Sequence, residues 1–152
     1  MKEGFEKDRG ETIPDARIRE LIGKAEEQLR LAYAPYSGFC VAAALLCEDG
    51  TVYTGCNVEN ASYPAGNCAE RTAVFKAVSE GRREFSGIVI MGGPGGRTGS
   101  YCPPCGICRQ VLREFCRPLG FSVILARSAE DYRVFSLEEL LPESFGPEFL
   151  DR

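Results

Sequence analysis

Three cysteines and one glutamate have the types and spacing needed to activate water. Residues 68–71 read Cys-Ala-Glu-Arg, and residues 104–108 read Pro-Cys-Gly-Ile-Cys. Zinc binds thiolates at about 2.3 Å in tetrahedral geometry, and a catalytic zinc usually has three protein ligands and keeps its fourth position for water. The spacing therefore predicts a zinc site formed by Cys68, Cys105 and Cys108.

Glu70 separates a catalytic zinc from a structural one. A carboxylate two residues after the first ligand can take a proton from the activated water and pass it to a substrate nitrogen. The chain has no histidine, so a carboxylate, thiol, lysine or metal-bound water must carry out any proton transfer near neutral pH. Three thiolates and Zn²⁺ sum to a negative charge. We expect two helix N-termini and Arg71, acting from outside the ligand shell, to offset part of it.

The periodicity of apolar residues predicts the elements that position these groups. A helix begins near Pro14 and ends before Pro35. Strands over 41–47 and 51–56 flank Asp49-Gly50, which is a hairpin signal. A loop over 57–67 then leads to a helix over 68–80, with Asn67 as its N-cap and Gly81 closing it.

The second half of the chain continues the alternation. We expect a strand over 88–91, a glycine-rich loop over 92–99, and a helix that opens at Pro103-Pro104 and runs to residue 115. Strands over 123–126 and 132–135 follow, and Ser136 with Glu139 forms a capping box for a last short helix. This order predicts an α/β fold of three layers, α/β/α, around a mixed five-stranded sheet that combines a hairpin with βαβ crossovers.

Composition limits the other possibilities. A length of 152 residues suits one domain, which we place at 12–152 after a flexible extension over 1–11. The net charge of -4 gives no electrostatic support for binding nucleic acid or an anionic membrane. We found no secretory signal and no apolar run long enough to span a bilayer, so we expect a cytoplasmic protein whose eight cysteines stay reduced.

The pairing of Cys-x-Glu with Pro-Cys-x-x-Cys is the known signature of zinc nucleobase deaminases in its three-cysteine form. The chain resembles the cytidine deaminase family, in its small homotetrameric form, from about Leu29 to Leu150. The matching blocks are Phe39 and residues 34–37, 54–63, 68–72, 75–81, 105–111, 139–142 and 144–148. Cys40, Ala42 and Ile107 depart from the residues that the family favours.

The resemblance implies one zinc per subunit and hydrolytic deamination of cytidine and deoxycytidine to uridine and deoxyuridine, with release of ammonia, as in pyrimidine salvage. Zinc-bound hydroxide would attack C4 of the base, and Glu70 would shuttle the proton. The substrate-binding residues it implies are Asn57 and Glu59 for the ribose, Ala69 and Phe39 for the base, and Ala61, Tyr63 and Phe145 for a neighbouring subunit's pocket.

Other interpretations remain at this point. In one alternative, the substrate is a different aminopyrimidine nucleoside, such as blasticidin S. A structural Cys₄ zinc or iron-sulfur site is another, because Cys102 extends the cysteine series at the same spacing. A redox Cys-x-x-Cys pair explains neither Cys68 nor Glu70.

Overall fold

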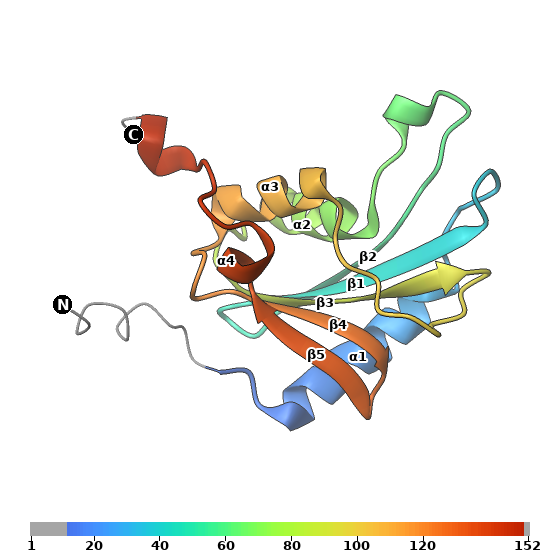
Figure 1. The fold of residues 1–152 in the computed structure, drawn as a ribbon, viewed down its shortest axis with the longest axis horizontal. Helices are drawn as coiled ribbons and strands as arrows, with labels where there is room; N and C mark the ends of the chain where they lie inside the picture. The colour runs from blue at the N-terminus through green and yellow to red at the C-terminus, as the bar shows by residue number, and fades with distance from the viewer. Residues whose placement is uncertain (1–11, 151–152) are drawn as a thin grey trace.

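The computed structural model describes residues 12–150, so the extension expected over 1–11 lies outside the described residues. The chain mixes helices with strands, and two pairs of strands follow one another directly (Figure 1). The elements are α1 (Asp15–Leu29), β1 (Phe39–Cys47), β2 (Val52–Cys56), η2 (Tyr63–Ala65), α2 (Ala69–Ser79), β3 (Phe85–Pro94), α3 (Gly106–Phe115), β4 (Ser122–Ser128), β5 (Asp131–Ser136), α4 (Leu137–Leu140) and η3 (Pro147–Leu150).

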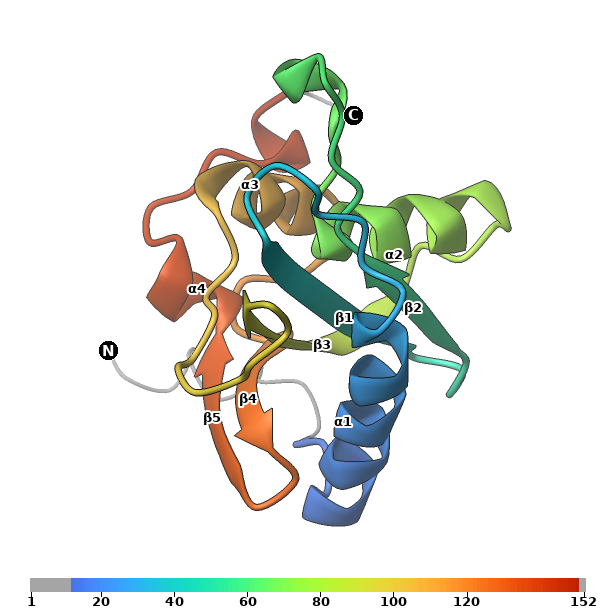
Figure 2. The same cartoon turned by 90° about the vertical axis from the view of Figure 1, so that its right-hand side faces the viewer.

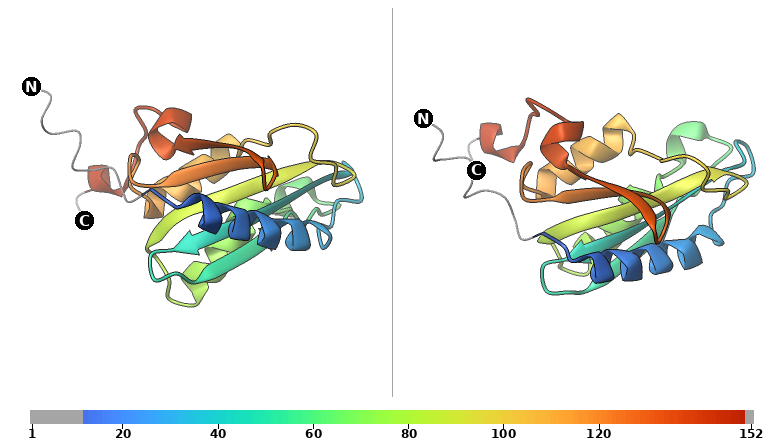
Figure 3. Two further views of the ribbon diagram at one scale, coloured as in Figure 1. Left: turned by 90° about the horizontal axis from the view of Figure 1, so that it is seen from below. Right: turned by 60° about the horizontal axis from the view of Figure 1, so that its bottom comes forward.

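The strands form one five-stranded sheet in the order β2-β1-β3-β4-β5. Strands β3 and β4 are parallel, and the other neighbouring pairs are antiparallel. Helix α1 covers one face, whereas α2, α3 and α4 lie over the other (Figures 1 and 2). Figure 3 shows α1 running along its face of the sheet. The predicted three-layer architecture with a mixed sheet is therefore confirmed.

Two buried clusters hold the layers together, one on each face of the sheet. Strand β1 serves both, because successive side chains of a strand point to opposite faces. Ala43 and Leu45 belong to the core under α2 and α3, and Ala44 belongs to the core under α1. The apolar stripe predicted for α1 is buried there, including Leu21 and Ile22.

The first predicted hairpin is present, with β1 and β2 joined by a turn in which Gly50 has φ 88°. The Asp49 carboxylate accepts a hydrogen bond from the Thr51 N–H at 3.0 Å. A second hairpin joins β4 to β5, where Ser128 pairs with Asp131. The sequence did not predict it, because the intervening residues, Ala129 and Glu130, carry no turn signal.

The predicted loop over 92–99 is wrong in its first part, because β3 continues to Pro94. A Cβ atom at Gly92 would lie 2.4 Å from the carbonyl oxygen of Cys40, and one at Gly93 would lie 1.9 Å from that of Arg97. These two glycines thus allow close approach of neighbouring backbone and do not mark a loop.

Two helices begin later than predicted. Cys68 is the N-cap of α2, in place of Asn67, and Cys105 is the N-cap of α3, which starts after Pro103-Pro104. Gly81 closes α2 as expected, with φ 87°. No helix within residues 12–150 is both long and apolar enough to cross a membrane.

Candidate active site

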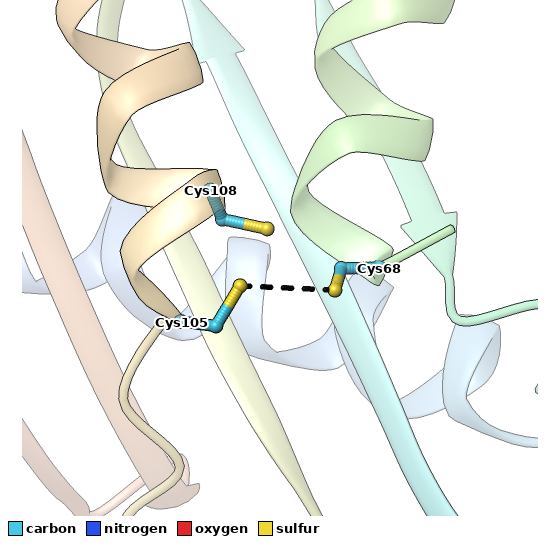
Figure 4. A group of neighbouring side chains, drawn as sticks. All are labelled: Cys68, Cys105 and Cys108. Carbon is cyan, nitrogen blue, oxygen red and sulfur yellow. Dashed lines mark hydrogen bonds between the residues drawn. The ribbon is translucent and has the colours of Figure 1, made fainter. Parts of the chain in front are cut away.

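The three predicted metal ligands lie together between the starts of α2 and α3 (Figure 4). The sulfur atoms of Cys68, Cys105 and Cys108 all lie within 4.8 Å of one another, and those of Cys68 and Cys105 are 3.9 Å apart. Ligands at about 2.3 Å on a tetrahedral ion place their sulfurs about 3.8 Å apart. The donor set and its spacing therefore fit zinc.

Both helices present their positive ends to this cluster. Cys68 and Cys105 are the N-caps of α2 and α3, and Cys108 lies in the first turn of α3. Because a helix N-terminus stabilises negative charge, this arrangement favours thiolates. Gly55 in β2 sets the height of α2 above the sheet, since a Cβ atom there would lie 2.5 Å from the Ala69 carbonyl oxygen.

Glu70 points into the protein beside the sulfurs and is only 4% exposed. Its Oε2 accepts a hydrogen bond from the Cys108 thiol at 3.3 Å. Burial raises the pKa of this carboxyl, because the charged form loses water without gaining an equal number of partners. A carboxyl with a raised pKa is suited to accept and release a proton near neutral pH.

Arg71 also contacts the cluster, with its NH2 group 3.3 Å from the Cys68 sulfur. Hydrogen bonding with Cys108, and then with Arg71, lowers the pKa of the Cys68 thiol. The Nε atom of Arg71 is buried and has no hydrogen-bond partner among the described residues. The guanidinium group therefore offsets the negative charge of the thiolates although one of its nitrogen atoms stays unpaired within residues 12–150.

A pocket of about 470 Å³ opens next to the cluster. Cys68 and Arg71 form part of its wall, and the rings of Tyr36 and Tyr63 meet in a tilted pair with centroids 5.8 Å apart. The other lining residues are Ser37, Asn57, Val58, Glu59, Asn60, Gly66 and Asn67. A small ligand can therefore lie beside Cys68, whereas Cys105, Cys108 and Glu70 are not part of the wall.

Two predicted ribose-binding residues, Asn57 and Glu59, line this pocket and also hold its backbone. The Asn57 amide accepts a hydrogen bond from the Val41 N–H at 2.8 Å and donates one to the Phe39 carbonyl oxygen at 2.7 Å. The Glu59 carboxylate accepts one from the Tyr36 N–H at 2.8 Å. Asn57 thus fixes the start of β1, and Glu59 fixes the loop before it, while both line the pocket.

The remaining predicted substrate residues do not line the pocket of this chain, apart from Tyr63. Phe39 is partly exposed, and Ala69 is buried at the start of α2. Ala61 is exposed next to the pocket segment. Phe145 is also exposed and stacks on Phe149 with centroids 5.3 Å apart, while the Gln110 side chain donates a hydrogen bond to its carbonyl oxygen at 3.0 Å.

The sequence did not single out several pocket residues. Tyr36 and Ser37 belong to the block 34–37 that matches the family, and this match could have identified them as pocket residues. Asn60 belongs to the matching block 54–63, and Asn67, expected only as a helix cap, directly precedes Cys68. Gly66 lies in neither a matching block nor a predicted cap. In the part of the chain that the structure describes, the cysteine cluster does not include Cys102, so a Cys₄ site lacks its fourth ligand.

The fold, the three thiols and the buried carboxyl beside an open pocket define a zinc-dependent hydrolase of the nucleobase deaminase class. A family sequence model described as "Cytidine and deoxycytidylate deaminase zinc-binding region" matches residues 16–119. The cytidine deaminase of Sporosarcina psychrophila is 44% identical over 133 residues, which cover 88% of this chain and 94% of the relative. The chain belongs to the cytidine deaminase family.

Two further relatives agree with this assignment. The cytidine deaminase of Halalkalibacterium halodurans is 48% identical over 128 residues, covering 84% of this chain and 93% of the relative. The crystal structure of cytidine deaminase from Burkholderia pseudomallei is similar with a TM-score of 0.75 and 48% identity, covering 83% of this chain and 97% of that one. The zinc-binding region matched by the family model contains all three clustered cysteines, so the cofactor is zinc, one per subunit.

Proposed function

We propose that this protein deaminates free cytidine and deoxycytidine by hydrolysis, giving uridine, deoxyuridine and ammonia in pyrimidine salvage. The observation that carries this proposal is the buried Glu70 carboxyl in hydrogen-bond contact with Cys108, one of three clustered sulfurs, of which Cys68 lines a pocket of about 470 Å³. The relatives that are 44% and 48% identical to this chain over the aligned residues are cytidine deaminases.

In this proposal Cys68, Cys105 and Cys108 hold the zinc. When bound, the ion supplies Lewis acidity that lowers the pKa of a water molecule. Glu70 takes a proton from that water and delivers it to N3 of the base. It then takes the second proton from the hydroxyl group added at C4 and passes it to the amine, which leaves as ammonia. The positive charge of Arg71 offsets part of the negative charge of the sulfurs through its contact with Cys68.

Asn57 and Glu59 bind the ribose hydroxyls. Their position in the pocket wall supports this role. Phe39 packs on the pyrimidine, and the backbone at Ala69 meets the base. A free nucleoside suits this pocket better than a polynucleotide, because the chain's net charge of -4 offers no attraction for phosphates.

We further propose a homotetramer in which Phe145 and the segment from Ala61 to Tyr63 complete a neighbouring subunit's pocket. The exposure of large apolar side chains supports this arrangement, since Tyr63 is 76% exposed and Phe145 is 56% exposed. Residues 12–152 then act as one deaminase domain, preceded by an extension over 1–11, in a cytoplasmic protein that uses neither nucleic acid nor membrane.

The test is the loss of cytidine ultraviolet absorbance with purified, zinc-loaded protein. Replacing Glu70→Gln keeps the shape of the side chain and removes its proton transfer, so turnover should fall by about 10²- to 10⁴-fold with zinc content unchanged. The matched control is Glu80→Gln, at the other end of α2, which should retain full activity.

Two results would contradict the proposal. Full activity of the Glu70→Gln variant would refute the proton-transfer role. A flat trace with folded, zinc-loaded protein would exclude cytidine, and activity of the same sample on blasticidin S would move the assignment to that aminopyrimidine nucleoside.

A further inference from the structure

The segment that leads to the zinc ligand Cys105 has little structure of its own. Residues 95–104 connect β3 to the N-cap of α3 without a helix or strand. Gly95 and Gly96 have positive φ values of 61° and 78°. Glycine loses more conformational freedom on folding than other residues, so this segment needs external contacts to hold one conformation.

The Gly95 N–H donates to the Gly38 carbonyl oxygen at 2.7 Å, and Tyr101 packs against the core under α2 and α3. The other contacts come from the β4–β5 hairpin and centre on Tyr101. The Tyr101 hydroxyl donates a hydrogen bond to the Asp131 carboxylate. The guanidinium groups of Arg133 and Arg127 lie 4.4 Å and 5.1 Å from the centroid of the Tyr101 ring. Arg127 also donates from Nε to the other Asp131 oxygen at 2.8 Å. We call these four residues the Tyr101 cluster.

Further hydrogen bonds fasten the segment on both sides of this cluster. The Thr98 hydroxyl donates to the Arg127 carbonyl oxygen at 2.8 Å, and Arg127 donates to the Gly99 carbonyl oxygen at 3.3 Å. Beyond the cluster, Arg109 of α3 donates to the Pro104 carbonyl oxygen at 2.8 Å. Figure 2 shows the segment passing beside the hairpin before it reaches α3.

We propose that Tyr101 is a positioning residue for the zinc site, acting through Cys105. Cys105 is exposed and lies at the N-cap of α3, so the preceding segment sets where its backbone enters the site. Cys108 lies within the helix and depends less on that segment. Tyr101, four residues before Cys105, holds the segment against a hairpin that is part of the central sheet. The ligand is thereby preorganised before metal binds.

This inference rests on the proposed zinc ligands, and it is tested by metal retention. The variants are Tyr101→Phe, which removes the hydroxyl, Tyr101→Leu, which also removes the ring, and Asp131→Asn, which weakens the partner. The matched control is Tyr132→Phe. Tyr132 is also on β5 and donates to an aspartate, Asp15, at 2.8 Å, but that contact ties the hairpin to α1.

The first readout is the rate of zinc transfer from intact protein to a chromogenic chelator. We expect transfer to be about 10-fold faster in Tyr101→Phe and faster still in Tyr101→Leu, since loss of an outer contact typically costs about 10- to 100-fold in metal affinity. The second readout is the absorption spectrum of the Co²⁺-substituted protein, in which the sulfur-to-cobalt and ligand-field bands should broaden and weaken. Tyr132→Phe should leave both readouts unchanged.

Each result decides one part of the argument. Equal zinc transfer and an unchanged cobalt spectrum in the Tyr101 and Asp131 variants would overturn the positioning role. An equal effect of Tyr132→Phe would assign the change to general loss of stability and would also overturn it. Absence of stoichiometric zinc from the unaltered protein would instead refute the ligand assignment. If Tyr101→Leu does not fold, Tyr101→Phe and Asp131→Asn give the same decision.

Discussion

Replacing Gly55→Ala should disturb the metal site without touching any proposed ligand. The added Cβ would lie 2.5 Å from the Ala69 carbonyl oxygen and 2.6 Å from the Ala73 nitrogen, and both atoms belong to the backbone of α2. Ordinary contact begins at 3.4 Å, so the start of α2 must move by about 0.9 Å. Overpacking of this kind costs about 1–3 kcal/mol of unfolding free energy.

The larger effect should be on catalysis. Helix α2 positions Cys68 and Glu70, whereas Cys105 and Cys108 belong to α3, so the shift changes the distance between the two halves of the site. A displacement of about 1 Å costs roughly 100-fold in rate when it misplaces reacting groups. We therefore expect turnover of cytidine to fall by about 100-fold, with weaker zinc retention measured by chelator competition.

The control is Gly23→Ala, at a helical position in α1 where an added Cβ meets nothing within 4 Å. Alanine is favoured over glycine in a helix by about 0.5–1 kcal/mol, so this variant should be slightly more stable and fully active. Normal activity and zinc retention in Gly55→Ala would show that α2 tolerates the added methyl group, and the reasoning from close approach would then be refuted.

Two other predictions concern the ligands and the C-terminal segment. Cys105→Ser should lower zinc occupancy, measured by metal analysis, whereas Cys116→Ala, at a buried cysteine outside the cluster, should retain full zinc; unchanged occupancy in Cys105→Ser would exclude it as a ligand. A hydrogen bond from its own backbone, together with the ion pair with Arg113, lowers the pKa of Glu148 below its ordinary value of 4.5. The Glu148 carboxylate therefore stabilises the folded protein above pH 4.5, and this contribution is lost as the pH falls through the lower folded-state pKa. The difference in thermal midpoint between the unaltered protein and Glu148→Gln should therefore disappear in acid, and a difference that is independent of pH would exclude this linkage.

The metal site was readable from the sequence because its chemistry is concentrated in two short blocks. Cysteines three residues apart near a helix start must lie on one side of it, and one further cysteine completes the donor set. The hairpin over Asp49-Gly50 was predictable for a similar reason, since the turn type demands those residues. Local rules were sufficient in both cases.

Other features depend on partners far apart in the chain. Gly92 and Gly93 looked like loop residues, and only the neighbouring backbone of Cys40 and Arg97 explains why they lie in or at the end of a strand. Tyr101 and Asp131 are 30 residues apart and follow no shared periodicity. Their contact arises from the packing of a connecting segment on a hairpin, which no pattern within either segment encodes.

The pocket wall and the sulfur cluster are built on different kinds of backbone. Most of the wall comes from the connection between β2 and α2, whereas the sulfurs lie at the starts of two helices packed on the sheet. Substitutions in that connection at positions away from Cys68 can therefore alter which molecule is admitted while the three sulfurs keep their positions. For enzyme engineering, this makes selectivity and reactivity two properties that can be varied independently within one small scaffold.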